Sequence, residues 1–442
     1  MFLDGYKDMV ESVPFAIQLP PMTLDGLLSS FPILLLAAIL TGSSSDPYFE
    51  KQAGETFRHV LADRVIIRGQ KSLQLLQSLL TYMTWYHHRF DPQTVQFYQL
   101  LQLANGMVAD LGLPRRFAKE GTFDGRGDED VNAMRAFLLC YYLNCGGGVL
   151  GYDRPENMRC IDNLRNAAKW LAEVSDKALD KESPALVELL HIVSLHRDDG
   201  NGNRSEHRVP PSRGFAEWKA TYIRQETSAS LRSSYHFVAA YSVLKSSGSE
   251  SMSSQDVRLS LQHFNAVLSN ILDQKLCYLV QLGIIEWAHL ITTLFLLARL
   301  ESSRAVKSGT EGSFDQPLLV LQYVARFRAL VDCLTTQAET STAFRAPHLL
   351  GWLDKILTAV MQQSSSVEAS RVSSSDESDH YHHHHHHHHQ QESAYEIVNS
   401  FMDDRGNVRH PAPKEPTNVR KQVQRKDEED FWTDFMSDWL NW

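Results

Sequence analysis

The chain has 442 residues, of which 43% are hydrophobic and 22% charged. This composition is typical of globular proteins and excludes a wholly disordered or collagen-like chain. The formal net charge of −10 provides no general attraction for a nucleic-acid backbone, so we expect no direct DNA binding by this chain. Five scattered cysteines are too few for a disulfide scaffold and favour a reducing compartment.

The N-terminal residues do not resemble a secretory signal, because MFLDGYKDMVE is acidic where such a signal is basic. The most apolar stretch, Phe31 to Gly42, has a continuous apolar part of about ten residues, whereas a membrane span needs about 20. We therefore expect a buried helix here and no membrane association. Residues 1–30 are assigned as an N-terminal lead-in.

Residues 31–363 predict a succession of helices, because apolar side chains recur at three- and four-residue steps and no strand alternation competes. One helix begins near Lys71, and the next is expected to begin at Asp91 and to stop at Gly112 and Pro114. Further helices are expected at Val131–Leu143, Asn163–Ala178, Pro184–His196, Phe215–Leu244, Gln255–Gln281, Ile284–Glu301, Pro317–Glu339 and His348–Gln362. Because no fixed repeat period is visible, the interpretation is an all-α, irregular multi-helix stack.

The composition changes after Gln363, and residues 364–426 are assigned as a disordered linker, rich in Ser and His and then basic. Its tract His382 to His389 would chelate metals in solution, but no ordered metal site follows from it. Residues 405–426 carry seven basic groups and one acidic group. Within them lies a candidate nuclear import signal, formed by Arg420, Lys421, Arg425 and Lys426.

Signals for catalysis are thin, and we expect neither enzymatic activity nor a cofactor. The sequence has no phosphate-binding loop, nucleophile elbow or zinc-protease motif. The spacing of Ser242 and Lys245 mimics one nucleophile motif at the end of an apolar helix. Cys140 and Cys145 lack the spacing of a zinc knuckle and are expected to be buried structural thiols, and Cys145 to Gly148 are expected to form a helix-stopping turn.

The C-terminal segment, residues 427–442, carries six acidic groups and no basic ones. On a helix its large apolar side chains cover one half of the circumference and its acidic and hydroxyl side chains cover the other. This pattern is typical of an acidic activation segment that folds when a partner's hydrophobic groove accepts it, although docking on the protein's own core is the alternative. The side chains expected to bind a coactivator are Phe431, Trp432, Phe435, Met436, Trp439 and Leu440.

Two segments resemble the regulatory domain of fungal zinc-binuclear-cluster transcription factors. In His59 to Arg115, a leucine-rich helix ending in Trp-Tyr-His precedes a Gln-Leu-rich helix ending in Asp-Leu-Gly-Leu. The segment Arg135-Ala-Phe-Leu-Leu-Cys-Tyr-Tyr-Leu, followed by Tyr152-Asp-Arg-Pro, resembles the family's second signature, and the C-terminal segment resembles its activation tail. The resemblance implies an all-α regulatory domain, a nuclear location and a role in transcription.

The sequence departs from the family because no cysteine precedes Cys140, whereas family members begin with six cysteines that bind two zinc ions. The chain is then either a regulator without its own zinc cluster or the product of a truncated gene model. The resemblance implies as partners transcriptional coactivators, another zinc-cluster factor or a second copy of the chain, and a small-molecule effector. The alternative hypothesis is an all-α interaction scaffold or adaptor without a transcriptional role.

Overall fold

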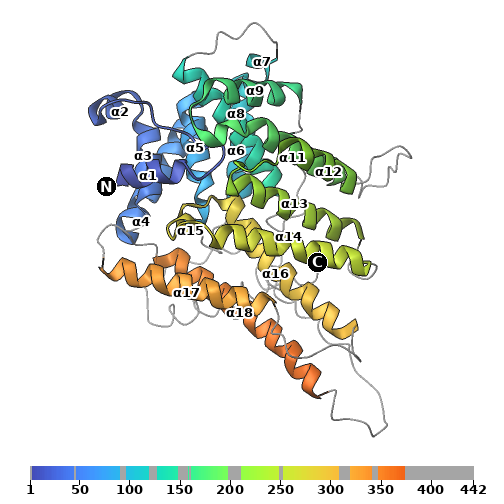
Figure 1. The fold of residues 1–442 in the computed structure, drawn as a ribbon. Helices are drawn as coiled ribbons and strands as arrows, with labels where there is room; N and C mark the ends of the chain where they lie inside the picture. Colours follow the sequence, from blue (N-terminus) through green and yellow to red (C-terminus); the bar gives the residue numbers. More distant parts are fainter. Residues whose placement is uncertain are drawn as a thin grey trace, which may run out of the picture. The chain divides into compact units, whose positions relative to one another are not determined.

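The computed structural model describes residues 2–43, 46–89, 96–118, 127–147, 158, 161–197, 211–247, 252–307, 319–340 and 347–373. These residues form eighteen α-helices, one π-helix and one 3-10 helix, with no strand among them (Figure 1). The prediction of an all-α, irregular multi-helix stack is therefore confirmed. One compact unit comprises Met1–Ser364, and a second comprises Ser365–Trp442.

The N-terminal residues are part of the compact unit rather than a lead-in to it. Helix α1 (Phe2–Val10) packs on α3 (Pro32–Gly42), which in turn packs on α5 (Leu73–Thr84). The close approach of α1 and α3 requires glycine at position 42, because a Cβ there would lie 2.0 Å from the Phe2 carbonyl oxygen. The cluster that joins the N-terminal residues to the rest of the core consists of Tyr6, Met9, Val10, Val13, Ala16, Ala38 and Trp85.

The apolar stretch of α3 is a buried helix, as predicted. Its sequence begins with Pro32 in the first turn, where a proline needs no hydrogen-bonded N–H. Six of its apolar side chains are buried, namely Ile33, Leu34, Leu35, Ala37, Ala38 and Leu40. No helix among the described residues is long and apolar enough to cross a membrane.

Three elements flank this layer: α2 (Leu24–Ser30), α4 (Pro47–Leu61) and the π-helix η1 (Ala62–Ile67). Thr23 caps α2 and Asp46 caps α4 through side-chain oxygens that accept backbone N–H groups. None of the three was predicted from the sequence. Large apolar side chains stay exposed on and beside α2 and η1, namely Met22, Leu24, Leu28, Ile66 and Ile67.

The helix predicted to begin at Asp91 begins later. After α5 the chain forms the 3-10 helix η2 (Tyr86–Arg89), and α6 spans Phe97–Asp110 because Gln96 is not yet helical. Residues 90–95 lie outside the described part. Gly112 ends the helix with a left-handed φ of 65°, and Pro114 lies in the first turn of α7 (Leu113–Arg116).

Helix α8 (Asp128–Gly147) includes three of the four residues that were predicted to form a turn, and the fourth, Gly148, lies outside the described part. Cys145, Gly146 and Gly147 are helical. A Cβ on Gly146 would lie 2.2 Å from Cδ1 of Ile285, so this glycine lets α8 approach the first turn of α16. The glycine therefore serves close packing, a reason that is not visible in the local sequence.

Two long helices predicted for the second half are each divided. The segment 215–244 forms two helices because Thr227 Oγ1 accepts the Arg224 N–H and Ser228 Oγ accepts the Leu231 N–H, which makes a turn and a new N-cap. The segment 255–281 is likewise interrupted after Leu272, and the segment 163–178 leaves the helix after Val174. The bounds are α9 (Asp162–Val174), α10 (Ala178–Lys181), α11 (Ser183–Arg197), α12 (Pro211–Tyr222), α13 (Ala229–Ser247), α14 (Ser254–Leu272) and α15 (Tyr278–Gln281).

The last three helices agree closely with prediction at their N-terminal ends and extend further at their C-terminal ends. They are α16 (Ile284–Lys307), α17 (Leu319–Thr340) and α18 (Pro347–Ser373). The first ten residues of the segment assigned as a disordered linker, 364–373, are thus helical. Residues 374–442 lie outside the described part.

Candidate functional site

The side chains predicted from sequence to bind partners lie outside the described residues. These are the coactivator-binding set Phe431, Trp432, Phe435, Met436, Trp439 and Leu440, and the import candidates Arg420, Lys421, Arg425 and Lys426. The histidine tract and the second half of the second signature, Tyr152 to Pro155, lie outside them as well. The described part contributes the helical unit and its buried polar groups.

The described residues contain no group of three or more His, Cys, Asp or Glu side chains that could hold a metal ion. Cys140 and Cys145 are both buried on α8, as predicted for structural thiols. Burial raises the pKa of the Cys140 thiol to about 12, an effect that a hydrogen bond with Asn144 only partly offsets. Cys140 is therefore a protonated and unreactive thiol at neutral pH.

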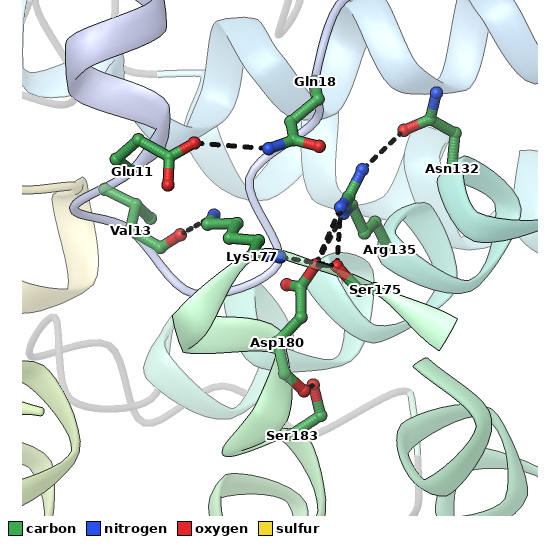
Figure 2. Close-up of polar contacts among 9 residues, drawn as sticks. All are labelled: Glu11, Val13, Gln18, Asn132, Arg135, Ser175, Lys177, Asp180 and Ser183. Carbon is green, nitrogen blue, oxygen red and sulfur yellow. Dashed lines mark hydrogen bonds and ion pairs between the residues drawn. The ribbon is translucent and has the colours of Figure 1, made fainter. Parts of the chain in front are cut away.

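A buried polar network joins α8, the α9–α10 connection and the N-terminal residues (Figure 2). Arg135 on α8 donates to Asp180 Oδ2 on α10, with Nε at 2.9 Å and Nη2 at 2.8 Å. Ser175 donates to the same oxygen at 2.6 Å, and Arg135 also donates to Ser175 Oγ and to Asn132 Oδ1. The Arg135 and Asp180 side chains are 5% and 0% exposed. The pair is therefore a buried ion pair, in which the hydrogen bonds offset the cost of removing both charges from water.

The local chain conformation sets up this pair. Ser175 has an extended backbone that ends α9, which lets its hydroxyl accept the Lys177 N–H and reach Asp180. Ser183 donates to the Asp180 carbonyl at 2.6 Å and so fixes the end of α10. The early end of the predicted 163–178 helix is therefore explained by this network.

Lys177 connects the same network to the N-terminal residues. Its ammonium donates to the Val13 carbonyl oxygen at 2.8 Å, and the side chain is buried (Figure 2). Burial lowers the pKa of Lys177 to about 8, because desolvation outweighs the nearby charge of Asp180. Gln18 donates to Glu11 at 3.2 Å across the same loop. Lys177 thus holds the N-terminal segment through its backbone at Val13, while the exposed contact of Gln18 with Glu11 lies within that segment.

A second buried contact joins α8 to α16. The Tyr142 hydroxyl donates to Glu286 Oε1 at 2.8 Å, while Oε2 has no hydrogen-bond partner among the described residues. Burial raises the pKa of Glu286, and it raises the pKa of Tyr142 still more clearly, with the Glu286 charge adding to the effect. Gly283 makes room for this carboxylate, because a Cβ there would lie 2.8 Å from Glu286 Oε2.

Two residues of the Trp-Tyr-His motif contact α15 and α16. Trp85 Nε1 donates to the Gln281 carbonyl at 3.2 Å, and Ser12 donates to the Gln281 side chain at 2.8 Å. The His87 side chain is partly buried with both ring nitrogens removed from solvent, and its ring centroid lies 5.6 Å from that of Trp287. Desolvation, with smaller effects of His88 and Arg89, lowers the pKa of His87 well below its ordinary value. The imidazole is therefore neutral at physiological pH.

The geometry of these groups fits a structural role. Each network is buried and most of its polar atoms are paired with one another, so it fixes the N-terminal segment, α8, α10 and α16 in one arrangement. Sequence reasoning missed Lys177, Asp180 and Glu286 as members. One usable signal was Glu286, a single carboxylate inside the apolar run Gly283-Ile-Ile-Glu-Trp-Ala.

Comparison with known proteins found no matching family model, curated protein or solved structure. The two segments that carry the resemblance to zinc-cluster factors nevertheless meet in the same core. Trp85 and His87 come from the first segment and contact the α15–α16 region, while Arg135 and Tyr142 come from the second and contact α10 and α16. In this chain the motif residues hold the helical unit together.

Proposed function

We propose that the chain is a nuclear transcriptional regulator of the fungal zinc-cluster type that acts on genes transcribed by RNA polymerase II. Its helical regulatory unit occupies residues 31–363 together with the N-terminal residues that pack on it. Its output is the acidic-aromatic segment 427–442. The chain itself has no enzymatic role in this proposal and makes no sequence-specific contact with DNA.

The observation that carries the proposal is the pattern of the C-terminal segment. Six acidic groups keep a set of large apolar side chains solvated until a partner accepts them. An amphipathic helix of this kind can bind in a hydrophobic groove of a partner protein whose rim is basic. The preceding segment, residues 405–426, has a net positive charge, whereas the C-terminal segment has a net negative charge. The same basic segment contains the candidate import signal.

The helical unit supports the regulatory half of the proposal. The resemblance rests on the segments 59–115 and 135–143, and both contribute buried anchors to one core. A unit built this way has the rigidity to present a surface to an effector, to a second copy or to another factor. In the proposal these partners set how much of the activation segment reaches the coactivator.

A reporter assay tests the output segment. Residues 427–442, fused to a heterologous DNA-binding domain, should activate a reporter gene, and replacing Trp432, Phe435 and Trp439 with Ala should abolish the activation. Thr433→Ala with Ser437→Ala is the matched control on the polar half of the same helix and should leave activation in place. An inactive wild-type fusion would contradict the proposal.

An interaction scaffold without a transcriptional role is the second candidate function. It is favoured by the exposed apolar side chains around α2 and η1, because Ile66 and Ile67 are 66% and 77% exposed. A cytoplasmic location of the full chain together with an inactive output segment would favour the scaffold. A nuclear location that is lost when Arg420, Lys421, Arg425 and Lys426 are replaced with Ala would favour the regulator.

A further inference from the structure

Helices α13 and α14 lie side by side (Figure 1) and bring two histidines into direct contact. The Nδ1 atoms of His236 and His263 are 2.8 Å apart, and the ring centroids are 5.1 Å apart. Such a contact requires one ring to donate a proton and the other to accept it, so the two Nδ1 atoms share one proton. Both side chains are half-buried and reach the surface of the unit.

Two further basic groups lie beside this pair. Arg232 precedes His236 by one helical turn on α13, and Lys219 comes from α12, with its ammonium 5.8 Å from the Tyr235 ring centroid. The Tyr235 ring is itself 5.1 Å from His236 and 5.8 Å from His263. We call Lys219, Arg232, His236 and His263 the basic cluster.

The charges that act on the two imidazoles are all positive among the residues that the structure describes. Desolvation lowers the pKa of His236 to about 4, with His263, Lys219 and Arg232 acting in the same direction. Desolvation and then Lys219 lower the pKa of His263. Elsewhere in the unit, three buried or partly buried arginines have acidic partners: Arg135 has Asp180, Arg89 has Glu50 and Arg165 has Glu188.

The other elements that pack on α13 do not change this balance. On α16, His289 stacks on Phe237 with ring centroids 4.0 Å apart, and burial keeps its imidazole neutral by lowering its pKa to about 3. On α11, Glu188 is engaged by Arg165, with 2.6 Å between Nε and Oε1. On α12, Glu217 pairs with Arg213 at 2.9 Å.

We propose that the basic cluster is a binding site for the oxyanion of a small ligand, a phosphate or carboxylate group. An oxyanion at this position would accept hydrogen bonds from both imidazoles once each carries a proton, and from the guanidinium and ammonium groups beside them. When a second proton binds, the hydrogen bond between the two Nδ1 atoms breaks and the rings move apart, because two protonated Nδ1 atoms repel each other. Binding therefore takes up protons, and affinity rises as the pH falls towards the ordinary range of histidine. This inference does not depend on the proposed role in transcription.

Isothermal titration calorimetry of the full chain with sulfate tests the site, because sulfate keeps its charge across the pH range in which histidine titrates. Malonate is the second probe, and it distinguishes a carboxylate site from one that takes tetrahedral anions. Titrations in two buffers of different ionisation enthalpy give the number of protons taken up. We expect proton uptake on binding and tighter binding at about pH 5.5 than at about pH 8.

Two sets of variants identify the cluster. Lys219→Ala and Arg232→Ala, at an exposed and a half-buried position, should each weaken sulfate binding by about 3- to 10-fold at low salt. His236→Gln with His263→Gln should remove the proton uptake. The matched controls are Lys275→Ala at an exposed position and His191→Gln, because His191 is partly buried but has Glu188 beside it.

Every variant keeps the histidine tract at residues 382–389, so differences between variants report on the cluster and not on that tract. Circular dichroism confirms that each variant is folded. Equal affinity in the cluster variants and the controls would overturn the proposal, as would sulfate binding that takes up the same number of protons without His236 and His263.

Discussion

Arg135 on α8 and Asp180 on α10 form an ion pair that is almost completely buried, with Nη2 and Oδ2 2.8 Å apart. Arg135 begins the segment that resembles the second signature of the zinc-cluster regulators. Through Ser175 and Lys177 the pair is continuous with the Val13 carbonyl (Figure 2). Arg135, which the sequence analysis assigned to a family motif, therefore has a structural role: it helps to hold α8, α10 and the N-terminal segment together.

Removing one member of this pair should strongly destabilise the unit. Asp180→Ala leaves a buried guanidinium without its counter-ion, and we expect a loss of about 3–5 kcal/mol in the free energy of unfolding. Urea denaturation followed by circular dichroism measures it. Glu217→Ala breaks the exposed pair with Arg213, whose side chains are 64% and 70% exposed, and is the control with an expected change below about 0.5 kcal/mol. Equal effects of the two substitutions would contradict a buried role for Asp180.

The two helical glycines Gly146 and Gly106 should respond to alanine in opposite directions. Gly146→Ala forces a Cβ against Ile285 and should cost about 1–3 kcal/mol of stability. In an Ile285→Ala background, which has its own cost because Ile285 is buried, the same substitution should cost less. Gly106 lies within α6, and no atom lies within 4 Å of the place that an alanine methyl group would take, so Gly106→Ala should stabilise by about 0.5–1 kcal/mol. Thermal melting of these variants, with Ile285→Ala alone as the reference for the double variant, decides this. A neutral Gly146→Ala would mean that α8 and α16 are not in close contact.

Buried neutral histidines should make the unit sensitive to acid. His289 has a pKa of about 3 in the folded chain, because burial disfavours its charged form, against about 6.5 when unfolded. Its contribution to stability is thus fully present above the unfolded value and is lost as the pH falls towards the folded value, at up to about 1.4 kcal/mol per pH unit. His289→Phe keeps the stack on Phe237 and should flatten the decline in urea midpoint between about pH 7 and about pH 4.5. His59→Gln, at an exposed position on α4, should leave the slope as it is in the wild type.

Glu286 should behave in the opposite way. Its pKa is raised in the folded chain, so ionisation opposes folding, and its contribution to stability is lost as the pH rises through the folded value. Glu286→Gln keeps an acceptor for the Tyr142 hydroxyl without the buried charge. We expect the variant to gain stability relative to wild type on going from about pH 4 to about pH 8. A relative loss over that range would show that the charged carboxylate is favoured in the core.

The regular spacing of apolar residues predicted most of the helices. It did not predict the breaks that side-chain hydrogen bonds fix. The buried helix at 31–42 and the starts of α11, α16, α17 and α18 followed from apolar spacing and from prolines at helix starts. The divisions of the helices predicted at 163–178 and 215–244 did not follow, because they are fixed by side-chain hydrogen bonds. Ser175 binds Asp180, and Ser228 binds the Leu231 N–H and Glu182. The spacing of apolar residues does not report such polar contacts, whether the partner lies five residues away, as Asp180 does, or 46 residues away, as Glu182 does.

The candidate sites divide in the same way. The amphipathic pattern of residues 427–442 is visible in the sequence, since it needs only one helix and its two faces. The contact of His236 with His263 was not visible, because it arises when α13 and α14 pack side by side. The N-terminal residues were assigned as a lead-in to the helical region. Their burial depends on the surface that α3, α15 and Trp85 offer them.

The proposed role in transcription is best tested by a reporter assay with the full chain tethered to DNA through a heterologous DNA-binding domain. We expect activation by the wild-type chain and its loss when Trp432, Phe435 and Trp439 are replaced with Ala. The chain with Thr433→Ala and Ser437→Ala should remain active, with all three present at equal amounts in the nucleus. Activation that survives the loss of the three aromatic side chains, or a wild-type chain that does not activate, would contradict the proposed role.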